Sequence, residues 1–157
     1  MTNMLNTFRI AIWTAGVVAC SGVDSPAPGP GTPPASQGIV AGVVQDSAGR
    51  GIPNATVCAV TAFTVSGTPT LVARQASTNA NGAYVVPINL TFKVEVRAPL
   101  TVTATPAAET GLAPASGPRD SVVITATPPP SETVHVNVVV RKGPPYDGVL
   151  CVFAAGP

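Results

Sequence analysis

Apolar and polar residues alternate along two segments of this chain, and a period of two is typical of β-strands with one buried face. In residues 92–98, four apolar side chains alternate with three charged ones. In Thr133–Arg141, every second residue from Val134 to Val140 is a valine, whereas His135 falls on the opposite face. The pattern predicts two strands whose apolar side chains point into a core.

Shorter apolar and β-branched runs, separated by turn-forming residues, predict the other strands. The alternation of Ile39 to Val44 predicts a first strand that either has both faces covered or forms an apolar edge. Pro87 either ends its strand or places it at a sheet edge, because proline has no N–H to donate. Thr105–Pro118 is predicted to be a long exposed loop. The predicted strands are 39–44, 55–63, 71–76, 83–86, 92–98, 122–126 and 133–141, with an additional one at 149–153.

This series of short strands predicts an all-β protein, a seven- to eight-stranded antiparallel β-sandwich over residues 38–153. Composition agrees, because threonine, valine, proline and glycine favour strands with frequent turns. Charged residues make up 10% of the chain and the net charge is +1, so there is no basic surface for nucleic acid. Aromatic residues make up only 4%, which leaves few platforms on which sugars could stack.

The N-terminal segment Ile10–Cys20 is a short apolar run that follows Arg9 and ends in small residues. A membrane-spanning helix needs roughly 20 apolar residues, so this run is too short to cross a bilayer. A basic flank, a short apolar run and small residues before a cut site indicate a secretory signal peptide. Val17 to Cys20 resembles the lipobox of bacterial lipoproteins. The resemblance implies that a signal peptide, residues 1–19, is removed and that Cys20 carries lipid.

The residues that follow Cys20 are rich in proline, glycine and serine and have almost no apolar side chains to bury. Residues 20–37 are therefore predicted to be the lipidated cysteine and a disordered tether, which holds the sandwich away from a membrane. The expected location is the bacterial cell envelope, after export. Because Ser21 stands where an inner-membrane retention signal would have aspartate, an outer-membrane address is favoured over an inner-membrane one.

An odd number of cysteines, three, is unusual for an exported chain, and lipid on Cys20 would explain it. Cys58 and Cys151 then remain, each in a strand-like run. In an oxidising compartment they would form a disulfide that stabilises the fold by about 4 kcal/mol. The alternative is that they are two small buried residues that never meet.

No catalytic, cofactor or metal site is predicted. His135 is the single histidine, and neither a metal centre nor a nucleophile pair can be built without partners for it. The seven carboxylates are scattered and form no calcium-binding run. The chain is therefore predicted not to be an enzyme.

Three segments together resemble the carboxypeptidase regulatory-like domain: Gly42–Asp46, Gly51–Val57 and Thr78–Tyr84. The resemblance covers about residues 38 to 100 and implies a transthyretin-like (prealbumin-like) sandwich without the activity of the peptidase itself. Gly82 and Tyr84 have structural interpretations in this motif, as a tight turn and as a buried ring with a bonded hydroxyl.

The leading functional hypothesis is a non-catalytic, lipid-anchored binding or scaffolding module. Its partners would be the membrane, through the N-terminal lipid, and an envelope protein or cell-wall polymer. The exposed loops Thr105–Pro118 and Val65–Thr70 are the predicted contact regions. The alternative is a structural surface protein that self-associates through exposed strand edges. The oligomeric state stays open.

Overall fold

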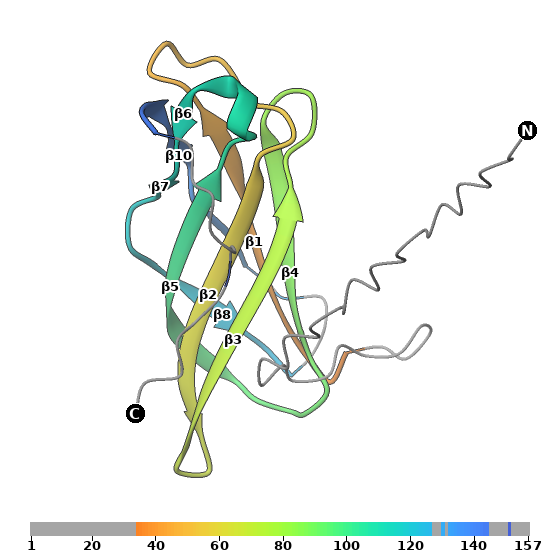
Figure 1. Ribbon diagram of the computed structural model, residues 1–157. Coiled ribbons are helices and arrows are strands. Elements are labelled where there is room, and N and C mark those ends of the chain that lie inside the picture. Colours follow the sequence, from red (N-terminus) through yellow and green to blue (C-terminus); the bar gives the residue numbers. More distant parts are fainter. Residues whose placement is uncertain (1–33, 127–129, 131, 145–150, 152–157) are drawn as a thin grey trace, which may run out of the picture.

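The computed structural model describes residues 34–126, 130, 132–144 and 151, and these form a β-sandwich (Figure 1). Within them, the regular structure is entirely β-strand apart from the short 3₁₀-helix η1, Ala108–Thr110. The predicted all-β sandwich is therefore confirmed. No helix in this described part is long and apolar enough to span a bilayer.

The first sheet has β1 (Ser36–Gln45) at its centre. On one side β1 pairs antiparallel with β4 (Ala83–Leu90). On the other side it pairs with β9 (Thr133–His135) and then with β10 (Val138–Val139). Neither predicted role for the first strand is correct: β1 has neighbours on both sides and is no edge, and its outer side chains Ile39, Ala41 and Val43 are only half-buried.

The second sheet has the order β3-β2-β5, and both β7 and β8 pair with the far side of β5. A separate short pair, β6 with β11, lies outside both sheets. The bounds are β2 Thr56–Val65, β3 Thr68–Ser77, β5 Val96–Thr105, β6 Leu112–Ala113, β7 Ala115–Ser116, β8 Asp120–Ile124 and β11 Arg141–Lys142.

The prediction that the sandwich is purely antiparallel is wrong at one place, because β9 and β10 run parallel to β1. The residue after β8, Thr125, exchanges two backbone hydrogen bonds with Gln37 at the start of β1. The chain therefore leaves β8 close to the beginning of β1. The next strand starts at that end and continues along β1 in the same direction.

The valine alternation of residues 134–140 is confirmed. Val134, Val136, Val138 and Val140 are buried, whereas His135 and Asn137 are exposed. Two buried faces, one from each sheet, make the core, and it consists mainly of valine, alanine, leucine and isoleucine.

The alternation of residues 92–98 is present in the burial of the side chains, but the predicted strand is displaced. β5 starts only at Val96 and continues to Thr105. The reason is Ser36, which is fully buried. Its hydroxyl donates to the Phe92 carbonyl at 3.0 Å and accepts from the Val94 N–H at 2.7 Å. The backbone of residues 92–94 thus bonds to a side chain of β1 rather than to a neighbouring strand.

The corner before β4 holds the turn that the sequence predicts. The Asn79 side chain accepts hydrogen bonds from the N–H groups of Asn81 and Ala83, and Gly82 has a φ of 75°. Thr78 ties this corner to the start of β2, because its hydroxyl donates to the Ile52 carbonyl at 2.6 Å and accepts from the Ala55 N–H at 2.9 Å. The side-chain hydrogen bonds of Thr78 and Asn79 therefore stabilise the turn before β4 and tie it to the segment before β2.

The side chain of Tyr84 on β4 contacts both β1 and the segment that follows β9. Its ring is 3% exposed, and its hydroxyl donates to the Val136 carbonyl, which lies just after β9. Gly42 on β1 provides the room, because a Cβ there would meet the Val136 carbonyl and the Tyr84 hydroxyl. The bonded hydroxyl expected for this tyrosine is present, although its acceptor is 52 residues away in sequence.

Burial raises the pKa of Tyr84 to about 12, because it removes water that would stabilise the charged phenolate. The folded state therefore holds this proton more tightly than the unfolded chain, whose tyrosines titrate at about 10. We expect full stability below pH 10 and a loss of about 1.4 kcal/mol per pH unit between pH 10 and 12. Urea unfolding across this range measures the slope, and Tyr84→Phe should remove it. An equal slope in the phenylalanine variant would contradict the assignment.

Candidate functional site

The proposed lipid site, Cys20, lies outside the described residues, as does the predicted signal peptide. The described part begins at residue 34, and β1 begins at Ser36, two residues before the expected start of the sandwich at Gly38. The last residues assigned to the tether, Ser36 and Gln37, therefore belong to the first sheet.

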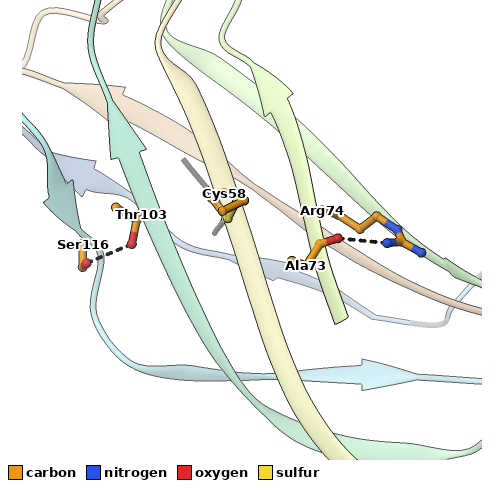
Figure 2. Close-up of a disulfide and its surroundings, with 6 residues drawn as sticks. Cys58, Ala73, Arg74, Thr103 and Ser116 are labelled. Atoms are coloured by element: carbon orange, nitrogen blue, oxygen red, sulfur yellow. Dashed lines mark hydrogen bonds between the residues drawn. A yellow bond between two sulfur atoms is a disulfide. The ribbon is translucent and has the colours of Figure 1, made fainter. Parts of the chain in front are cut away.

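The two other cysteines are brought together. Cys58 on β2 forms a disulfide with Cys151, with a Cα–Cα distance of 5.8 Å and a sequence separation of 93 residues (Figure 2). Of the two interpretations left open by the sequence, pairing is the correct one. Cys58 stands between Gln75 of β3 and Thr103 of β5 in the strand register.

The bond lies on the outer face of the second sheet. Along β2, Val57, Ala59 and Thr61 are buried and point into the sandwich, so Cys58 points outward. Cys58 is nevertheless only 4% exposed. The disulfide thus holds Cys151 against the outside of the β3-β2-β5 sheet.

This placement changes the expectation for residues 149–153, which were predicted to form a further strand. Cys151 lies in a turn and has a φ of 61°, which is the left-handed region and not an extended conformation. The prediction of a strand is therefore wrong at Cys151. The residues on either side of it lie outside the described part.

The two predicted contact loops are shorter and more ordered than expected. Val65–Thr70 is mostly strand, because β2 and β3 are joined by the two-residue turn Ser66-Gly67, in which both residues have positive φ. Thr105–Pro118 contains η1 and the two-residue strands β6 and β7. Ala115 and Ser116 of β7 pair with Ala104 and Thr103 of β5, and the Thr103 and Ser116 hydroxyls lie 3.1 Å apart (Figure 2).

The outer face of the first sheet carries a feature that sequence reasoning missed. The register aligns Ile39 with Pro87 and Thr133, and it aligns Ala41 with Val85 and His135. Val85 is 58% exposed and Val139, at the other side of the sheet, is 41% exposed. The alternation of Ile39, Ala41 and Val43 was the available signal, but it could not tell which face would be left uncovered.

We call this surface the β1 face and define it by the outward positions of β4, β1, β9 and β10. Its members are Gln37, Ile39, Ala41, Val43, Gln45, Ala83, Val85, Pro87, Asn89, Thr133, His135 and Val139. None of these residues is an aspartate, glutamate, lysine or arginine. Seven of the twelve residues are apolar and five are polar, so the face is uncharged and partly apolar, whereas the solvated side of a sandwich strand is normally polar.

Apart from Arg74 within β3, the charged side chains of the described residues lie in loops, in turns and near strand ends. Asp46 accepts hydrogen bonds from the N–H groups of Ala48 and Arg50 in the turn after β1, and pairs with the Arg50 guanidinium at 2.7 Å. The hydrogen bond from the Arg50 N–H holds the pKa of the Asp46 carboxyl below its usual value. Arg97 and Glu132 form a second, exposed pair at 3.1 Å.

Candidate chemistry in the described residues is sparse. His135 is exposed, with Ala41 as its register partner on β1. Among the residues that the structure describes, no three histidine, cysteine or carboxylate side chains come close enough to hold a metal ion together. No protein-family model and no curated protein sequence matches the chain.

Proposed function

We propose that this protein is a lipid-anchored envelope module, a non-catalytic sandwich of the carboxypeptidase regulatory-like type that binds or scaffolds other envelope components. The observation that carries the proposal is the disulfide between Cys58 and Cys151. A disulfide of this kind belongs to an oxidising compartment, which a chain reaches by export. It also leaves Cys20, at the end of the signal-like segment, as the one cysteine outside the bond.

The structural use of the motif residues supports the absence of catalysis. Gly82, Thr78 and Tyr84, which carry the family resemblance, are engaged in turn geometry and buried hydrogen bonds. A prealbumin-like fold within the sandwich class is part of the proposal. The proposed location is the outer membrane, in either leaflet. The proposed partner is a cell-wall polymer or an envelope protein.

The anchor is tested by Cys20→Ser. We expect this variant to lose labelling by radioactive palmitate and to move from the membrane fraction to the soluble fraction, because lipid on Cys20 is the proposed attachment. Cys151→Ser is the matched control, since it removes a cysteine without touching the proposed lipid site. Persistent labelling of the Cys20→Ser chain, or equal loss of labelling in both variants, would refute the anchor.

Self-association is the second candidate function, and the β1 face favours it. This face is uncharged and exposes the apolar side chains of Val85 and Val139, and proteins often cover exposed apolar patches with a partner. The strand edges that the sequence suggested for this role are less suitable, for the reasons given next.

A further inference from the structure

The free edge of β4 is protected against pairing with another strand. Val44 donates to the Gly82 carbonyl at 2.9 Å, and hydrogen-bonded and non-bonded pairs alternate in an antiparallel ladder. The backbone groups of Ala83, Val85, Pro87 and Asn89 therefore point away from β1. Ala83 bonds Asn79 through both its N–H and its carbonyl, and Pro87 has no N–H.

The neighbouring edge, on β3, is protected against strand pairing by the side chain of Arg74. Its guanidinium donates to the Ala73 carbonyl at 2.9 Å and to the Asn89 carbonyl of β4 at 3.4 Å (Figure 2 shows the first bond). One charged side chain thus occupies acceptors on the edges of both sheets. A charge placed along an edge in this way disfavours the addition of a further strand.

The two sheets differ in how their outer faces are covered. The outer face of the second sheet already carries Cys151, which is bonded to Cys58. On the β1 face, by contrast, Val85 and Val139 are exposed and flank the half-buried Ile39, Ala41 and Val43. Among the described residues, the β1 face holds two of the three exposed large apolar side chains, Val85 and Val139, whereas the third, Leu71, lies on β3 of the second sheet.

We infer that the β1 face is a contact surface for a second copy of this chain, in a two-fold dimer that packs sheet against sheet. The face has no charge with which to select a charged polymer or a charged protein surface. It is a sheet, and two sheets pack well face to face at about 10 Å. In a two-fold contact the same apolar residues meet their own copies, and without Asp, Glu, Lys or Arg on the face, no fixed charge is buried against its like.

The size of the face predicts a weak dimer. It offers 12 outward residues, the members of the β1 face, whereas a stable interface uses about 20–30 residues on each side. Copies held to one membrane are confined to a thin layer, which raises their effective concentration and compensates for weak contacts. Only this step rests on the proposed lipid anchor. Anchored copies all point the same way along the membrane normal, and a two-fold axis parallel to that normal keeps this common direction.

The test is photo-crosslinking of the full chain in its native cells, with benzoylphenylalanine placed at position 85, 139 or 71. We expect a covalent dimer from positions 85 and 139. Position 71 is the matched control, because Leu71 is 45% exposed but lies on β3 of the other sheet. The dimer band from position 139 should fall at least tenfold in a Val85→Glu chain and stay unchanged in a Leu71→Glu chain.

Three outcomes would overturn the inference: no dimer band from positions 85 and 139, a band with a different protein only, or a dimer that forms equally from position 71. Thermal melting of the Val85→Glu chain separates lost contact from lost folding, since Val85 is exposed and its replacement should leave the melting temperature within a few degrees. Palmitate labelling in the same cells reports on the anchor separately. A missing dimer with normal labelling therefore overturns the dimer alone.

Discussion

Cys151→Ser is expected to lower the free energy of unfolding by about 4 kcal/mol, because the cross-link closes a loop of about 93 residues. Cys58 and Cys151 are separated by 93 residues, so the bond restricts nearly the whole sandwich in the unfolded state. A loss of this size is a large part of the stability of a domain, which is typically about 5–15 kcal/mol. Urea unfolding at neutral pH measures it.

The two cysteines act as one unit, and this gives the control. Cys58→Ala and the double variant should each lose about as much as Cys151→Ser, because breaking either end removes the same constraint. Reduction of the unmodified protein should give the same loss. A double variant that loses the sum of the two single losses would show that the thiols matter through packing and not through the bond.

Gly42→Ala is expected to cost about 3 kcal/mol, mostly from overpacking with an added loss of one buried hydrogen bond. The new methyl group would occupy the space between β1 and the Val136 carbonyl, where the Tyr84 hydroxyl donates its hydrogen bond. Either the bond breaks or the chain after β9 moves away from β1. The free energy of unfolding, measured in urea beside the unmodified chain, reports the loss.

Two further variants separate the causes. Gly67→Ala adds a methyl group where no atom lies within 4 Å, so it should cost only about 1 kcal/mol for its positive φ. In a Tyr84→Phe background the hydroxyl is already gone, and Gly42→Ala should then cost less than it does alone. A Gly42→Ala protein within 1 kcal/mol of the unmodified chain would show that the close approach of Gly42 to Val136 is not needed.

The residues that face the core were predictable because the period of two in a strand is local. The alternating valines of residues 134–140 are all buried, and the turn at Gly82 is present. The limits of strands were less predictable. The strand expected at 92–98 starts at Val96, since the buried hydroxyl of Ser36 takes the backbone groups that would otherwise enter a ladder.

The candidate sites, like the strands, were predictable from the sequence only in part. The sequence showed that Cys58 and Cys151 lie in apolar runs, but not that they meet, because their distance depends on where the chain returns after β8. The β1 face was equally hidden. Alternation in residues 39–44 shows two apolar sides, and only the positions of the neighbouring strands decide which side is covered.

The sequence by itself determined the all-β class, the inward valines and the turn residues, since each follows from a few neighbouring side chains. The tertiary structure alone decided the parallel return along β1, the closure of the 93-residue loop and the exposure of the β1 face. These depend on residues far apart in the chain, which come together only through burial of the shared core. Pairing between distant strands is therefore set by the whole fold and not by any local pattern.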